Sequence, residues 1–131
     1  MEAKSIDDEL SDRPVLVTDA PDVEALLKAS SAALGTLEQF SVGTRRWRGV
    51  SPWERHRTAD ELIFILEGGP VTITVLTDSE AETVEVSERS VFIVPRGCWH
   101  KQVVENTATV LGVSPTGDAD ISFAEDPRSS N

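Results

Sequence analysis

The sequence predicts an all-β domain, a β-sandwich or a closed double-sheet roll, with one short helix near the N-terminus. Two patterns predict this class: about eight short strand-like segments separated by regular turn residues, and only one segment with helical periodicity. The 131 residues fit a single domain, and 39% hydrophobic residues are enough for an ordinary core. The spacing of a strand–helix–strand unit does not recur, so we expect antiparallel pairing.

The N-terminal region predicts one helix between two strand regions. Residues 1–13 are polar and acidic, and we expect a flexible acidic arm there. Residues 14–18 have the composition of a short strand. Asp19 is placed to cap a helix with Pro21 in its first turn, and this helix is predicted to end before Gly35.

The rest of the chain reads as strands. Phe40 and Val42 alternate with polar residues, and a basic strand continues over 44–48. Leu62–Leu66 is apolar at every position, which predicts a strand covered on both faces. The further predicted strands are 71–75, 83–86, 91–94, 99–104 and 109–113, with an edge strand at 121–123. We therefore predict one domain over 14–124 and a flexible tail over 125–131.

Charge and composition restrict the kinds of partner and the compartment that we expect for the protein. The net charge of −11 argues against nucleic acid, because phosphate binding needs clustered Lys and Arg. Many acids lie near the two ends, Asp118 and Asp120 among them, which indicates solvated arms. No apolar stretch approaches the length of a membrane span. The single cysteine, Cys98, and the absence of a signal-peptide pattern lead us to expect a cytoplasmic protein.

Four residues of metal-ligand type stand out. Glu54 and His56 are two positions apart, so in an extended strand both side chains point to one side. Glu61 begins the apolar run that follows them. His100, at the end of the segment 94–100, is the other of the two histidines in the chain. Imidazoles and carboxylates that converge on one point are ligands for a divalent transition metal.

These segments resemble the two motifs of the cupin family, a small jelly-roll barrel, also called a double-stranded β-helix. His56, Glu61 and Gly68 match the second histidine, the glutamate and the glycine of the first motif. Pro95, Gly97 and His100 match the core of the second. The resemblance extends over about 42–113. Reading His56 as the first histidine instead loses both Glu61 and its spacing to Gly68.

Three positions depart from the family pattern. Glu54 replaces the first histidine, Arg89 replaces a glycine, and Val104 replaces an asparagine. The resemblance implies the ligands Glu54, His56, Glu61 and His100. Two alternatives remain: Glu54 binds the metal and gives a site of zero net charge, or it stays outside and leaves a facial triad suited to non-haem Fe(II).

The resemblance further implies a metal-binding small cupin that is a metal-dependent enzyme of the oxygenase, isomerase or lyase type. Its cofactor would be a divalent transition metal (Fe, Mn, Ni, Co or Zn) and its partner a small organic molecule. The alternatives are a non-catalytic ligand or metal sensor and a metal-free, epimerase-like acid–base catalyst with His56 or His100 as the base.

The expected substrate pocket includes three more residues. Arg46 and Arg48 are candidates for holding a substrate carboxylate, and Cys98 shares the strand parity of His100. Assembly follows from the resemblance and from the exposed edges of sheets: we expect a homodimer, in which 14–18 could exchange between subunits.

Overall fold

Ten strands and two short α-helices make up the part of the chain that the computed structural model describes, residues 1–129. In chain order the elements are α1 (Ile6–Leu10), β1 (Leu16–Val17), α2 (Val23–Ser30), β2 (Ala32–Leu37), β3 (Phe40–Val50), β4 (Trp53–Arg55), β5 (Glu61–Gly68), β6 (Val71–Leu76), β7 (Ala81–Val86), β8 (Val91–Val94), β9 (Trp99–Pro115), β10 (Asp120–Ser122) and a 3₁₀ turn (Pro127–Ser129).

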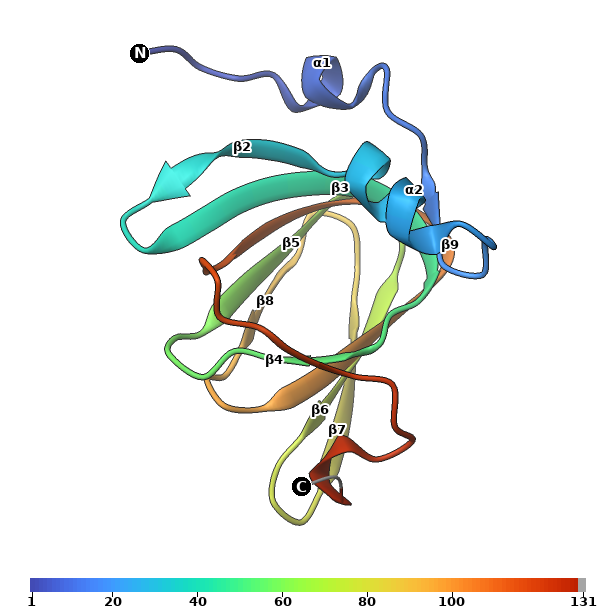
Figure 1. Ribbon diagram of the computed structural model, residues 1–131, viewed down its shortest axis with the longest axis vertical. Coiled ribbons are helices and arrows are strands. Elements are labelled where there is room, and N and C mark those ends of the chain that lie inside the picture. Colours follow the sequence, from blue (N-terminus) through green and yellow to red (C-terminus); the bar gives the residue numbers. More distant parts are fainter. Residues whose placement is uncertain (130–131) are drawn as a thin grey trace.

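The long strand β9 joins the two layers of the fold. Its first half pairs with β4 and β6, and its second half pairs with β3 and β5, all antiparallel. The strands β10 and β7 extend the first layer, while β2 and β8 extend the second. Figure 1 shows the two layers curving around a common interior. The predicted all-β, double-sheet jelly roll is confirmed. The two segments predicted at 99–104 and 109–113 are one continuous strand.

The core fills the space between the layers with alternate residues of each strand. Ile63 and Ile65 of β5 are buried, and so are Val71 and Ile73 of β6. The other faces of these strands are only half-buried. The prediction that the apolar run 62–66 is covered on both sides was therefore wrong, because Leu62, Phe64 and Leu66 lie on the outer face of the barrel.

The N-terminal helices lie over β2 and β3 (Figure 1). The range 1–13, predicted as an arm, contains α1, which Ser5 caps by accepting a hydrogen bond from the backbone N–H of Asp8. Leu10 at its end is only 1% exposed. Arg13 donates to the backbone carbonyl of Ser31 over 2.9 Å and so ties this segment to the end of α2. The mobility of the arm remains a prediction.

The second helix begins later than the sequence predicted and ends, as expected, before Gly35. It begins after Asp22, not after Asp19, and it ends at Ser30, because the chain from Ala32 onward pairs with β3 as the strand β2. Pairing with β3 outweighs the helical propensity of the two alanines there. The predicted strand at 14–18 is present as β1, which pairs in parallel with β3 of the same chain.

At the C-terminal end, β10 forms the predicted edge strand and pairs with β4. The predicted tail, 125–131, begins with a 3₁₀ turn at Pro127–Ser129, and its last two residues lie outside the described part of the chain. Among the described residues, no helix has the length and apolar character that a membrane crossing requires.

Candidate metal centre

Three strands bring the predicted ligands together at one end of the barrel. Glu54 of β4 lies directly opposite His100 of β9, so both side chains point to the same face. His56 follows Glu54 by two residues and points to that face as well. Glu61 is the first residue of β5, where Val94 of β8 is its neighbour. The motif residues, far apart in the sequence, therefore meet in space.

Their ligand atoms lie close together, although His56 is not part of the set whose ligand atoms all lie within 4.8 Å of one another. Oε1 of Glu61 lies 3.2 Å from Nε2 of His56 and 3.0 Å from Nε2 of His100. Oε1 of Glu54 lies 3.4 Å and 3.5 Å from the same two nitrogens. Ligand atoms of Glu54, Glu61 and His100 all lie within 4.8 Å of one another. The two imidazole rings are 6.1 Å apart, centroid to centroid.

The converging atoms are buried without hydrogen bonds. Nε2 of His56, Nε2 of His100 and Oε1 of Glu61 have no hydrogen-bond partner among the described residues. Buried polar atoms in proteins are nearly always paired. Here, at 3.0–3.5 Å, either protonated imidazoles form ion pairs with the two carboxylates, or a cation binds all of these atoms as ligands. A divalent cation satisfies all three at once. The donor set, two imidazoles with carboxylates, is suited to first-row transition metals.

His56 is held in the orientation that this role requires. Its Nδ1 contacts the backbone carbonyl of Asp118; since a carbonyl can only accept, Nδ1 carries the proton. In the neutral ring Nε2 then keeps its lone pair and faces the cluster. This arrangement, in which the second ring nitrogen is hydrogen-bonded, is typical of metal-binding histidines.

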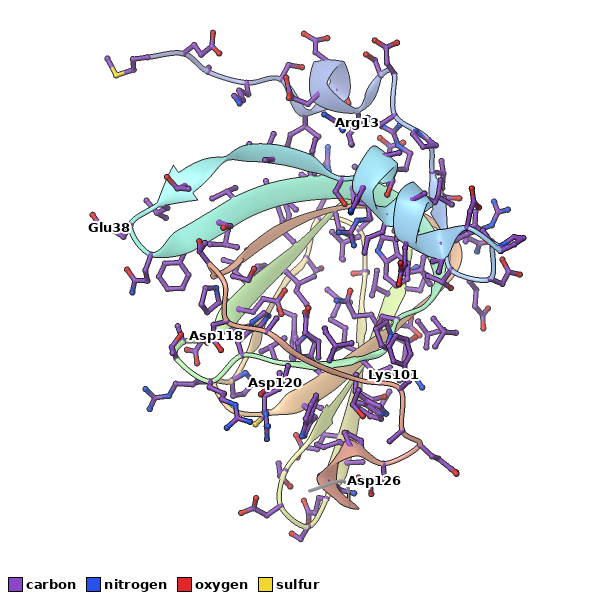
Figure 2. The ribbon with its side chains drawn as sticks, in the orientation of Figure 1. Arg13, Glu38, Lys101, Asp118, Asp120 and Asp126 are labelled. Atoms are coloured by element: carbon purple, nitrogen blue, oxygen red, sulfur yellow. The ribbon has the colours of Figure 1, made fainter. Side chains whose placement is uncertain are left out.

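Asp118 also fixes the loop that follows His56. Its carboxylate accepts hydrogen bonds from the backbone N–H groups of Arg57 and Thr58 and from the Thr58 hydroxyl, at 3.0, 2.8 and 2.6 Å. Asp120 binds the guanidinium groups of Arg55 and Arg57. Figure 2 shows both acids on the C-terminal segment that crosses this loop. The expectation that they belong to a solvated arm was wrong.

The four groups shift one another's proton affinities. Burial alone would lower the pKa of both histidines, but the carboxylates of Glu54 and Glu61 raise it to about 11 for His56 and about 9 for His100. Burial would raise the pKa of Glu54, but the two imidazoles lower it to about 2. They lower the pKa of Glu61 in the same way. Without a metal, the cluster therefore holds two protons at neutral pH.

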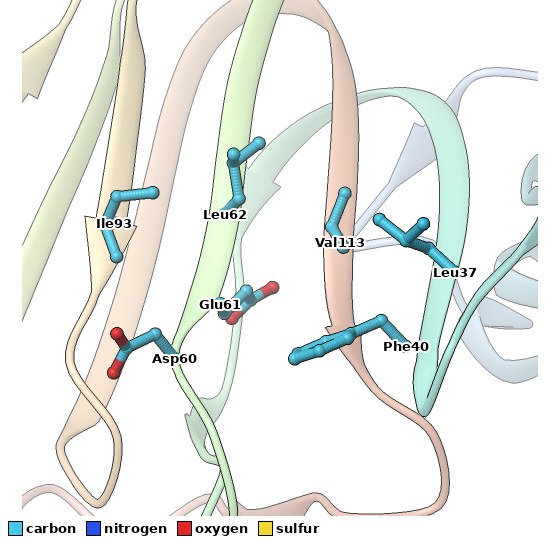
Figure 3. Close-up of a pocket in the computed structure, with 7 residues that line it drawn as sticks. All are labelled: Leu37, Phe40, Asp60, Glu61, Leu62, Ile93 and Val113. Carbon is cyan, nitrogen blue, oxygen red and sulfur yellow. The ribbon is translucent and has the colours of Figure 1, made fainter.

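The centre is open on one side. The Glu54 side chain is 33% exposed, whereas the side chain of His100 is 1% exposed. Glu61 also lines a shallow hollow of about 240 Å³, where Phe40 and Leu37 of the β2–β3 hairpin face Leu62 of β5 (Figure 3). The hollow lies on the outer face of β5, to which Leu62 points. Access to the cluster itself is at the partly exposed Glu54 side chain.

The expected pocket residues have other contacts. Arg46 donates from Nε to the Thr109 hydroxyl over 3.2 Å, and Arg48 is exposed. Cys98 is partly buried and packs against the hydrophobic core. The pocket role of these three residues remains a prediction. A third arginine of the same strand, Arg45, is also coupled to this region: burial lowers its pKa and the Glu54 carboxylate raises it.

Comparisons with known proteins agree with this architecture. The family described as "Cupin domain" matches residues 48–112. A search of curated proteins found no match. A cupin-2 domain containing protein from Shewanella frigidimarina superposes with a TM-score of 0.52 at 17% identity, covering 66% of this chain and 79% of that one.

Two enzymes have the same fold. Hydroquinone 1,2-dioxygenase from Sphingomonas sp. TTNP3, solved with 4-hydroxybenzoate, gives a TM-score of 0.56 at 17% identity over 65% of this chain and 64% of its own. Oxalate oxidase in complex with glycolate gives 0.61 at 19% identity over 91% and 66%. Such identities show a shared fold and nothing finer. Together with the family match and the two motifs, they show that this chain belongs to the cupin family.

Proposed function

We propose that this cupin binds one divalent transition metal through Glu54, His56, Glu61 and His100 and acts on a small organic molecule as an oxygenase, isomerase or lyase. One observation carries the proposal: the buried Nε2 atoms of His56 and His100 converge on Oε1 of Glu61, at 3.2 and 3.0 Å, and among the described residues only the carboxylates of the cluster lie beside them. The metal, one of Fe, Mn, Ni, Co or Zn, would supply Lewis-acid or redox chemistry.

The geometry favours Glu54 as a ligand over the facial-triad alternative. Its Oε1 is nearly equidistant from both Nε2 atoms, at 3.4 and 3.5 Å, and so approaches the same centre as Glu61. Two carboxylates then cancel the charge of a divalent ion. The partial exposure of Glu54 puts it on the side from which substrate enters, while His100 lies at the closed side.

Each remaining residue of the centre has a defined task. Asp118 orients His56 through its backbone carbonyl and holds the loop with its carboxylate. The burial of His56 and His100 keeps water away from their side of the centre. The raised pKa values of the two imidazoles disfavour the metal-free alternative, because a general base must be unprotonated at neutral pH.

Metal content tests the proposal directly. The protein is expressed with each candidate metal, desalted, and its metal measured by elemental analysis. We expect one ion per chain for the native protein and strong loss in His100→Ala. A Glu85→Gln variant, which removes an exposed carboxylate from β7, is the matched control and should keep its metal. A native protein that retains less than about 0.1 ion per chain would contradict the proposal.

The sensor alternative is distinguished by turnover. A metal-loaded protein that retains a small molecule tightly and returns it unchanged would be a binding module, whereas multiple product molecules per chain would show an enzyme. We keep the expectation of a homodimer and of a cytoplasmic location as part of this proposal. The single cysteine supports a reducing compartment.

A further inference from the structure

Arg45 lies on the interior face of β3. It stands opposite Val110, and two residues further on Trp47 stands opposite Ala108, where both side chains are buried in the core. Residues two apart on a strand share a face, so Arg45 points into the barrel with Trp47. Val110 in turn pairs with Ile65, which is 0% exposed and marks the same interior face on β5.

The guanidinium of Arg45 is only partly paired. Its Nε donates to the Ser31 hydroxyl over 3.0 Å. Its two terminal nitrogens make no hydrogen bond or ion pair with any described residue, although the side chain is half-buried. Burial lowers the pKa of Arg45 and the Glu54 carboxylate raises it, so the charge of Arg45 interacts with that of Glu54. A half-buried guanidinium with donors left over is suited to binding a carboxylate.

The charges of the centre define that partner. A divalent ion with the carboxylates of Glu54 and Glu61 and two neutral imidazoles has zero net charge. Arg45 adds one positive charge, so a monoanion makes the loaded interior neutral. Space is available beside it: the neighbouring interior position on β9 is Gly112, where a Cβ would meet no atom within 4 Å.

We propose that Arg45 binds the carboxylate of a small monocarboxylate substrate on the open side of the metal centre. The planar guanidinium offers its two terminal N–H groups to a carboxylate in a paired geometry that a lysine cannot match. The inference rests on the proposed function, since the charge balance assumes a bound metal. It names the class of substrate that the centre accepts: small organic acids that carry one negative charge.

The test is a binding measurement on the Zn(II)-loaded protein, by calorimetric titration with acetate and with acetamide, its uncharged analogue. We expect acetate to bind and acetamide to bind at least tenfold more weakly. Arg45→Gln should lower the acetate affinity about 10- to 100-fold, which is the effect of losing a charge-assisted hydrogen-bond pair. Arg45→Lys, which restores the charge without the planar fork, should recover part of the loss.

Two controls locate the effect. Lys28→Gln removes one positive charge from the exposed face of α2 and should leave acetate binding unchanged. Arg48→Gln tests the position predicted from the sequence; an acetate affinity that falls with Arg48→Gln and not with Arg45→Gln overturns the inference. Equal binding of acetate and acetamide by the native protein overturns it without the need for any variant.

The failure of this inference is separable from failure of the proposed function. A native protein that retains no metal overturns both. A protein that retains one ion per chain, and binds acetate equally well with Arg45→Gln, overturns only the role of Arg45. Metal content measured on each variant shows whether a lost affinity comes from the anion site or from the centre itself.

Discussion

Metal binding should release two protons at neutral pH. In the metal-free chain two protonated imidazoles balance the carboxylates of Glu54 and Glu61, and the pKa of the histidines is raised to about 11 and about 9. A divalent ion replaces both protons without a change in the charge of the interior. Between pH 7 and pH 8 the apparent metal affinity should therefore rise about 100-fold, a factor of ten for each proton released.

Calorimetric titration with Zn(II) at pH 7.5, in buffers that differ in ionisation enthalpy, measures the number of protons released per metal ion. We expect about two protons per ion. Histidines with an ordinary pKa near 6.5 would be largely neutral at this pH and would release about 0.2 protons in total. Histidines with an ordinary pKa would lose metal only below about pH 6. The carboxylates beside the imidazoles extend the pH dependence of metal binding to higher pH.

Glu61→Gln is the informative variant for this prediction. It leaves Glu54 as the one carboxylate beside the two imidazoles, so the metal-free cluster should hold about one proton in place of two. If the native protein releases fewer than about one proton per bound metal ion, the reasoning is refuted. The imidazoles would then have been neutral before the metal bound.

Three further predictions follow from the site and the fold. Asp118→Ala should weaken metal binding about 10- to 100-fold, because it releases the loop that holds His56. Asp120→Ala leaves the contacts of that histidine intact and should have a smaller effect. Metal titration of both variants measures the difference in affinity. Gly68→Ala should destabilise the protein by about 1–3 kcal/mol or more, because φ is +79° and the new Cβ would lie 2.2 Å from a backbone oxygen; Gly117→Ala, with φ +71° and open space, should cost less in urea unfolding. The metal-free protein should lose stability as pH rises, because the raised pKa of the imidazoles gives stability that is complete below about pH 6.5 and is lost between about pH 9 and 11. Unfolding midpoints that stay constant over pH 7–11 would contradict this last prediction.

Much of the fold was predictable because strand alternation and turn residues are local. Val71, Ile73 and Val75 alternate with threonines, and that pattern is the buried and half-buried alternation of β6. The run 62–66 has no such alternation. Its outer residues are apolar although they are only half-buried, so the sequence suggested a strand covered on both sides.

The candidate site was predictable where spacing carried the information. The two-residue step from Glu54 to His56 implied a shared face, and the structure brings both to one point with Glu61 and His100. The role of Asp118 was not predictable. Its contact with His56 joins residues 62 positions apart, and an acidic residue near a chain end reads as solvated.

Arg45 illustrates a limit of a different kind. Three arginines lie in the segment 45–48, and the sequence alone does not show which of them face the interior of the barrel. The burial of Trp47 shows which residues of β3 face the interior, because Arg45, two residues away, lies on the same face.

The central claim is that four side chains from three β-segments hold one metal ion. A crystal structure of the metal-loaded protein, with anomalous scattering recorded on both sides of the metal absorption edge, tests it most directly. The account predicts one anomalous peak between Nε2 of His56, Nε2 of His100 and the carboxylates of Glu54 and Glu61. A peak elsewhere, or imidazoles turned away from the ion, would contradict it.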